Sequence, residues 1–181
     1  MKVKKLTIDK LTTERLILIP FTINICKNIL NNDYRDLEAL NLKKGNGWPD
    51  EDVLDTLPRI INNLNKVEAP TGYESWMIIK KETREIIGDA GFKGFNFVND
   101  SIDIGYGIID EERRNGYAEE AVTALIHWAM TNEMVKEITA TCHLENINSI
   151  NLLTKLSFHL LKTENKMMYW SLANKHYYKK H

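Results

Sequence analysis

A turn with the composition of a phosphate-binding site lies between a strand-like run and an amphipathic helix, within residues 102–130. Its residues are small, polar or basic: Arg113, Arg114, Asn115, Gly116, Tyr117 and Ala118. A helix that begins at such a turn presents free backbone N–H groups and the positive end of its dipole, and both attract phosphate oxygens. The arrangement predicts a binding site for a pyrophosphate group.

Two carboxylates interrupt neighbouring strand-like runs upstream of this turn, Asp89 in EIIGDAGF and Asp103 in SIDIGYGII. A carboxylate beside a bound amine can accept a proton from it, directly or through a water molecule. Alternation of polar and apolar residues along a half-buried strand explains the same two residues as solvent-facing positions. The sequence leaves both interpretations open.

The segments before the turn predict a strand, then helices, then an antiparallel meander. Residues 11–19 end in an apolar β-branched run that Pro20 stops. Residues 22–66 carry apolar side chains at helical spacing, with a break at residues 45–49. Three short strand-like runs follow, at residues 73–80, 85–95 and 101–109.

The segments after the turn predict a helix, a strand, a second helix and a closing strand. The first helix has apolar residues at three- and four-residue spacing and is expected to expose four polar ones: Glu119, Glu120, Thr123 and His127. The strand covers residues 135–142, the second helix residues 148–156 and the closing strand residues 166–173. This order predicts one domain over residues 1–181, with a mixed α/β (α+β) fold rather than a repeating βαβ wheel.

Composition excludes several classes of protein. With 181 residues, of which 43% are hydrophobic and 27% charged, the chain can bury a core and is neither disordered nor fibrous. A net charge of −1 gives no overall basic field for nucleic acid or for an anionic membrane. Cys26 and Cys142 have no metal-ligand or disulfide spacing, so we expect no metal site and a reducing cytoplasmic location. The chain has no apolar run of about 20 residues, and residues 1–10 lack the apolar stretch of a secretory signal, so we expect a soluble intracellular protein.

Three motifs together resemble the GNAT superfamily of acyl-CoA-dependent N-acyltransferases. The turn at residues 113–118 matches the signature Q/R-x-x-G-x-G/A, in a context that strengthens a short pattern. Glu145, Asn146 and Ser149 match E-N-x-x-S, and residues 155–158 match K-x-G-F at the expected distance. Residues 12–16 and 104–106 resemble the branch of the RimJ and RimL ribosomal-protein N-terminal acetyltransferases.

Two residues depart from the family pattern. Ser157 stands where a glycine is usual, so we expect a serine with positive φ and modest strain in that turn. Gly107 follows Tyr106 where a bulky aromatic residue is common, so we expect a more open acceptor pocket.

The resemblance implies a mostly antiparallel central sheet flanked by helices, and acetyl-CoA as the acetyl donor. Backbone N–H groups from Arg114 to Ala118 would bind the coenzyme A pyrophosphate, with the Arg113 and Arg114 side chains adding charge. The strand before the turn would splay from its neighbour, and its main chain would pair with the pantetheine arm. By position these groups come from Ile108 and Asp110, with Ile109 nearby.

The second motif implies further roles. Asn146 matches an asparagine that hydrogen-bonds the pantetheine arm, and Ser149 matches a position proposed to protonate the departing thiolate. Lys155 belongs to the same cofactor motif. Elsewhere in the superfamily a tyrosine supplies that proton, but residues 145–158 contain none.

The predicted reaction is direct attack of an amine on acetyl-CoA in a ternary complex. The acceptor must lose a proton, which a peptide α-amine with pKa near 8 does more readily than a lysine with pKa near 10. Asp89 or Asp103 would act as the base, and no acyl-enzyme is expected. The partner is therefore a protein N-terminus or a small-molecule amine, bound by a monomer or homodimer.

Two other functions fit parts of the pattern. A non-catalytic acyl-CoA sensor would use the same phosphate-binding turn and would lack a working acceptor cleft. A nucleotide-binding protein would also use such a turn, but the sequences GxxxxGK[ST] and GxGxxG are both absent.

Overall fold

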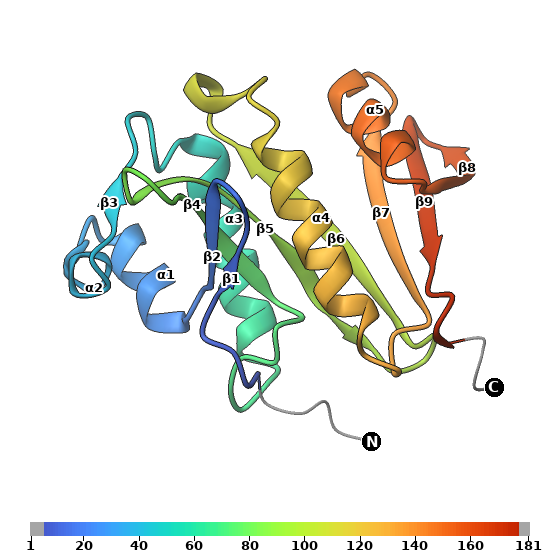
Figure 1. The fold of residues 1–181 in the computed structure, drawn as a ribbon, viewed down its shortest axis with the longest axis horizontal. Helices are drawn as coiled ribbons and strands as arrows, with labels where there is room; N and C mark the ends of the chain where they lie inside the picture. The colour runs from blue at the N-terminus through green and yellow to red at the C-terminus, as the bar shows by residue number, and fades with distance from the viewer. Residues whose placement is uncertain (1–5, 178–181) are drawn as a thin grey trace.

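A nine-stranded sheet runs through the computed structural model, which describes residues 6–177 (Figure 1). The strand order is β1-β2-β4-β5-β6-β7-β9-β8, with the short β3 paired to β5. The strands are β1 (Leu11–Thr12), β2 (Leu16–Pro20), β3 (Lys43–Lys44), β4 (Ser75–Lys80), β5 (Glu85–Asn96), β6 (Ser101–Ile108), β7 (Glu137–His143), β8 (His159–Glu164) and β9 (Met167–Ala173). Only the β6–β7 and β3–β5 pairs are parallel, so the sheet is mostly antiparallel.

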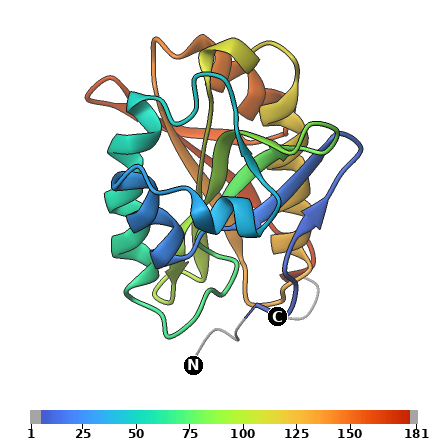
Figure 2. The ribbon, with the colours of Figure 1, turned by 90° about the vertical axis from the view of Figure 1, so that its left-hand side faces the viewer.

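Helices cover both faces of this sheet (Figure 2). They are α1 (Ile23–Leu30), α2 (Arg35–Ala39), α3 (Glu51–Leu64), the 3-10 turn η1 (Asp110–Glu112), α4 (Tyr117–Met130) and α5 (Ile147–Lys155). Helices α1 and α3 pack on one face, and α4 packs on the other against β2, β5 and β6. Because helices shield both faces, the central strand β4 is apolar on both sides and its residues 76–79 are buried.

Strands β6 and β7 diverge at the end that leads into the predicted phosphate turn (Figure 1). Their parallel pairing covers Ser101–Ile104 with Glu137–Ala140 and stops there. β6 continues to Ile108 along β5, whereas β7 continues to His143 along β9. The main chain of β6 beyond Ile104 is therefore free of β7 on that edge.

Most of the predicted elements are confirmed. Helices occupy residues 22–66 with a break around residues 45–49, the meander is antiparallel, and a helix follows the turn at residue 117. Ser157 has a φ of 64°, as expected for a residue in a glycine position. Both cysteines are buried and free. None of the helices within residues 6–177 is long and apolar enough to cross a membrane.

Three expectations were wrong. Residues 11–19 do not form one strand, because the Thr13 side chain closes a turn by accepting a hydrogen bond from the Leu16 amide at 3.0 Å, and β1 folds back on β2. Strands β3 and β8 were not predicted, since every residue in them is exposed and no alternation marks them. Glu120 is not a solvated residue of α4, because its carboxylate is bonded to the β1–β2 turn.

Candidate functional site

The turn between η1 and α4 has the backbone shape of an anion-binding loop. Arg114 and Gly116 both have positive φ, 64° and 78°, so two residues in three lie in the left-handed region. No described residue accepts a hydrogen bond from the amides of Arg114, Asn115 or Gly116. These donors point away from the protein's own acceptors and are free for a ligand.

Helix α4 begins differently from the other long helices. The N-terminal amides of α1, α3 and α5 are capped by the side chains of Thr22, Asp50 and Asn146. α4 begins at Gly116, which has no side chain to cap it, so its first amides and its dipole face outward. Within residues 6–177, α4 is thus the one helix of eight or more residues without a side-chain cap.

The space beside Gly116 is largely open. A Cβ placed on Gly116 would meet only one atom within 4 Å, Nη2 of Arg15 at 3.4 Å. The Arg114 side chain is exposed and has no partner among the described residues. The Arg113 side chain turns back instead: its Nε donates to the Ile108 carbonyl at 2.8 Å, and it forms an ion pair with Asp110.

The diverging end of β6 supplies part of the predicted main-chain site. Ile108 is the last residue of β6. The Ile108 carbonyl already accepts a hydrogen bond from Arg113, so the Ile108 amide is the group that remains for a ligand on the free edge of the strand. The Ile109 amide donates to the Ile87 carbonyl at 3.0 Å and is not free. Asp110 opens η1, and its carbonyl accepts from the Arg113 amide. Ile108 is therefore the stronger candidate of the three.

Helix α5 presents the residues of the second motif beside α4. The Asn146 Oδ1 accepts from the Ser149 amide at 3.0 Å, so its side-chain amide donor stays available. Lys155 forms a 2.8 Å ion pair with Glu119 on α4, which ties the two helices together next to the turn. Ser149 lies on the first turn of α5 and is partly buried.

Tyr106 is a residue that the sequence analysis did not assign to the site. Its hydroxyl is buried and forms no hydrogen bond of ordinary geometry with any described residue. Burial raises the pKa of Tyr106, and the nearby Ser149 side chain partly opposes that rise. In the sequence, Tyr106 is recognisable only as the tyrosine of the IGY run. The fold brings it close to Ser149, which lies on a helix that is distant in the sequence.

Asp89 lies in a cleft of about 610 Å³ between α3 and the sheet. Burial, together with the nearby charge of Asp50, raises the pKa of Asp89 to about 7, and the charge of Arg59 partly opposes this rise. Asp89 is paired across strands with Gly107, so it lies opposite the next-to-last residue of β6. A carboxyl with this pKa can accept and release a proton near neutral pH.

Asp103 lies outside the Asp89 cleft and has interaction partners of its own. It forms an ion pair with Lys93 and accepts a 2.8 Å hydrogen bond from Thr139. It lines a separate cavity of about 880 Å³ and is absent from the lining of the Asp89 cleft. The structure therefore brings Asp89, and not Asp103, to the diverging end of β6.

Glycines form part of the floor of the Asp89 cleft. Gly91, Gly105 and Gly107 all line it, and a Cβ on Gly105 or Gly107 would meet nothing within 4 Å. The expected open pocket beside Gly107 is thus present as empty space. Tyr106 also borders this cleft, and because neighbouring residues of a strand face opposite sides, its side chain extends from the other face of β6, toward Ser149. The base candidate and the acid candidate lie on either side of β6.

Comparisons with known proteins agree with this geometry. Residues 15–159 match the acetyltransferase (GNAT) domain family. The uncharacterized N-acetyltransferase YjdG of Bacillus subtilis (strain 168) is 33% identical over 165 residues, which cover 91% of this chain and 98% of that protein.

Two solved structures share the fold. The ribosomal-protein-S5-alanine acetyltransferase from Vibrio fischeri is 16% identical, with a TM-score of 0.65 over 92% of this chain and 97% of that one. The microcin C7 self-immunity acetyltransferase MccE, solved with acetyl-CoA and AMP, is 16% identical, with a TM-score of 0.60 over 89% of this chain and 93% of that one.

Proposed function

The chain belongs to the GNAT acetyltransferase family, as an acetyl-CoA-dependent acyltransferase, and we propose that it acetylates a primary amine by direct attack within a ternary complex. The observation that carries this proposal is the position of Asp89, whose pKa is about 7, in a cleft that adjoins the free edge of β6. Acetyl-CoA supplies the acetyl thioester. The residues of this chain hold the donor, receive the acceptor and move the protons.

Asp89 is the proposed base. An α-amine with pKa near 8 can transfer its proton to a carboxylate of pKa about 7 at a cost of about 1.4 kcal/mol. An ordinary aspartate, with a pKa near 4, would make the same transfer cost about 5 kcal/mol. The burial that raises the pKa of Asp89 therefore removes most of this cost. The lower pKa of the amine itself favours an α-amine over a lysine side chain.

Ser149 and Tyr106 are the proposed acid side. Once the thioester bond breaks, the thiolate sulfur needs a proton, and Ser149 occupies the first turn of α5 beside the free edge of β6. The buried Tyr106 hydroxyl lies against Ser149 and has a proton to donate to it. Tyr106 would thus orient the serine hydroxyl and return the proton that the serine gives up.

The amides at residues 114–118 and the side-chain amide of Asn146 are the proposed donor site. The free edge of β6 at Ile108 would pair with the pantetheine amides, and Arg114 would add charge near the phosphates. We also assign Lys155 to this site, where its ion pair with Glu119 holds α5 against α4.

The cleft supports the proposed acceptor class. It has a glycine floor and contains both acidic and basic side chains, including Asp50, Asp89 and Arg59. An acceptor with some bulk next to its amine fits such a floor. A protein N-terminus and a small-molecule amine both have this character, and the related folds include an enzyme named for ribosomal protein S5 alanine.

Calorimetric titration with acetyl-CoA, followed by measurement of thiol release, tests this proposal. The acceptor panel contains peptides with free α-amines, the same peptides acetylated at the N-terminus but carrying a lysine, and small amines. We expect binding, and release with α-amines that rises as the pH passes through 7. Binding without release from any acceptor would favour an acyl-CoA sensor, and absence of binding would refute the assignment.

A further inference from the structure

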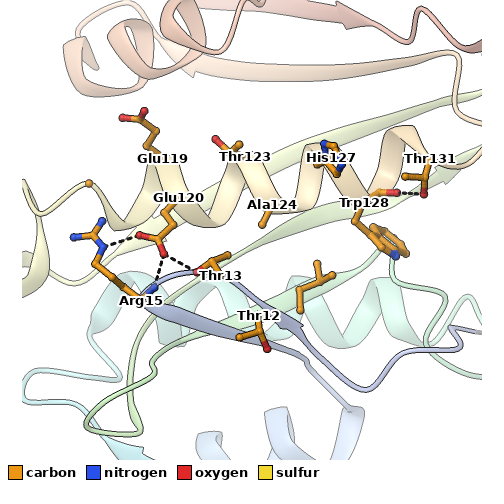
Figure 3. A pocket seen from close by; sticks show the side chains of 12 residues that line it. Thr12, Thr13, Arg15, Glu119, Glu120, Thr123, Ala124, His127, Trp128 and Thr131 are labelled. Atoms are coloured by element: carbon orange, nitrogen blue, oxygen red, sulfur yellow. Dashed lines mark hydrogen bonds and ion pairs between the residues drawn. The ribbon is translucent and has the colours of Figure 1, made fainter.

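Arg15 extends from the turn between β1 and β2 to the phosphate-binding turn, 100 residues away in sequence (Figure 3). Its Nη1 donates to the Asn115 carbonyl at 2.9 Å, and its Cζ lies 4.6 Å from the centre of the Tyr117 ring. Its Nη2 is the atom nearest to the Cβ position of Gly116. One guanidinium therefore contacts three consecutive residues of the turn.

Glu120 holds this guanidinium in place. Its Oε2 accepts from Arg15 Nε at 2.7 Å, and its Oε1 accepts from the Arg15 amide at 2.8 Å and from the Thr13 hydroxyl at 2.6 Å. Figure 3 shows Thr13 and Arg15 converging on Glu120 beneath the first turns of α4. The Glu120 carboxylate is thus bonded to the β1–β2 turn. The Arg15 charge offsets the negative charge of Glu120 next to the phosphate site.

The hydrogen bond to the Asn115 carbonyl also sets the direction of the next amide. The C=O and N–H of one trans peptide lie in a plane and point in opposite directions. When Arg15 holds the Asn115 carbonyl on its own side, the Gly116 N–H must point to the other side. A carbonyl turned toward that side would repel phosphate oxygens.

The turn depends on such an external contact. Two of its residues have positive φ, and a non-glycine residue such as Arg114 adopts that conformation at an energetic cost. The amides of residues 114–116 have no partners among the described residues, and the local contacts are the Asn115 side chain, which donates to the Glu112 carbonyl at 3.2 Å, and the Arg113 amide, which donates to the Asp110 carbonyl at 3.3 Å. A fixed guanidinium from another part of the chain adds a constraint on the Asn115–Gly116 peptide itself.

We propose that Arg15, held by Glu120, is a positioning residue that presents the Gly116 amide to the pyrophosphate of the acetyl donor. This inference rests on the proposed function, because it assigns how the donor site of that function is formed. It gives a role to the Thr-Glu-Arg run near the N-terminus, which the reaction itself does not use.

The test compares donors with and without the pyrophosphate. Coenzyme A is titrated into wild-type protein and into Arg15→Gln, Arg15→Lys and Glu120→Gln, and acetylpantetheine, which lacks the nucleotide and its phosphates, is used as a substrate in parallel. The matched control is Arg84→Gln, because Arg84 also donates to two backbone carbonyls, at 3.1 and 3.2 Å, in a distant part of the fold. Thermal unfolding checks that each variant is folded.

We expect Arg15→Gln to weaken coenzyme A binding about 10-fold or more, the range for a hydrogen bond to a charged group. Arg15→Lys should lose most of the same affinity, because an ammonium keeps the charge but cannot contact Glu120 and Asn115 together. Glu120→Gln should lose less, and Arg84→Gln should bind normally. The KM for acetylpantetheine should stay unchanged in all four variants.

Other outcomes overturn the inference. Normal affinity in Arg15→Lys would mean a direct charge contact with phosphate instead of positioning. Equal losses with coenzyme A and acetylpantetheine would mean a general structural role, and unchanged coenzyme A binding in Arg15→Gln would mean no role. Failure of the wild-type protein to bind coenzyme A would instead refute the proposed function, so the two failures are distinguishable.

Discussion

The phosphate turn and the Asp89 cleft adjoin each other along β6, yet they are built from different chemical groups. The turn at residues 113–118 offers main-chain amides, and its side chains are either free, as in Arg114, or folded back, as in Arg113. The cleft offers side chains from α3 and β5, whose charges act on one another across a glycine floor. The turn is formed by consecutive residues, whereas the cleft is formed by segments that are distant in the sequence.

This difference explains why the two regions tolerate change differently. A backbone site depends on the φ and ψ angles of a few consecutive residues, so a single Cβ can close it. A side-chain site depends on charge and on water exclusion, so its residues can be replaced without loss of the fold. Variants in each region should therefore fail in different measurements.

The largest expected effect is in the turn. Gly116→Val should weaken coenzyme A binding by ~10³-fold or more, because a β-branched residue resists a φ of 78° and its Cβ would press on Arg15 Nη2, so the turn no longer presents its amides and at least two bonds to a charged ligand are lost. Calorimetry measures the loss. Gly94→Val is the control, because Gly94 also has positive φ, 95°, and has free space around its Cβ position. Normal binding by a folded Gly116→Val protein would contradict the assignment.

The next effect is in the cleft. Asp89→Asn should lower kcat/KM by about 10²–10³-fold while coenzyme A affinity stays unchanged, as expected for loss of a general base. Asp103→Asn is the control and should change kcat/KM less than about twofold, since it affects a partly exposed ion pair with Lys93 and a hydrogen bond from Thr139, and Asp103 itself lies outside the Asp89 cleft. Equal losses in both variants would remove the distinction between the two carboxylates.

The same substitution of Asp89 should stabilise the fold. Its pKa is raised in the folded state, so the folded protein binds the proton more tightly and loses stability as the pH rises from about 4 to about 7. Above that range the ionised group costs about 2–4 kcal/mol, which Asn removes. Urea unfolding at pH 8 should show the gain and unfolding at pH 4 should not. A gain at both pH values would point to packing instead.

A smaller effect is expected on the acid side. Tyr106→Phe and Ser149→Ala should each lower kcat by about 10-fold, the value of one or two hydrogen bonds, with little change in coenzyme A affinity. The double variant should lose no more than Ser149→Ala alone, because Tyr106 acts through the serine. Additive losses in single-turnover measurements would show that the two residues act separately.

The smallest effect is a shift of the pH profile. Asp50→Asn should lower the midpoint of kcat/KM and Arg59→Gln should raise it, each by less than about one pH unit, because Asp50 raises and Arg59 lowers the pKa of Asp89. Asparagine also caps helices, so the α3 cap at residue 50 is preserved. Shifts in the same direction would contradict Asp89 as the titrating group.

The fold was largely predictable where one face of an element is buried. The helix after the turn and the meander of β4, β5 and β6 carry their periodicity in the sequence. β8 was not predictable because all its residues are exposed, so its sequence shows no alternation of buried and exposed residues. Glu120 was misassigned for a related reason: a carboxylate on a polar helix face looks solvated until the β1–β2 turn is placed against it.

By itself, the amino-acid sequence determined the turn at residues 113–118 that we propose binds phosphate, because its residues are consecutive and their backbone preferences are local. It also determined the E-N-x-x-S cap of α5, where Asn146 bonds the Ser149 amide three residues on. Only the tertiary structure distinguishes the surroundings of Asp89 from those of Asp103, which occupy similar alternating strands. Desolvation and the charges of Asp50 and Arg59 on α3 set the pKa of Asp89, and these depend on distances in space that spacing along the chain does not encode.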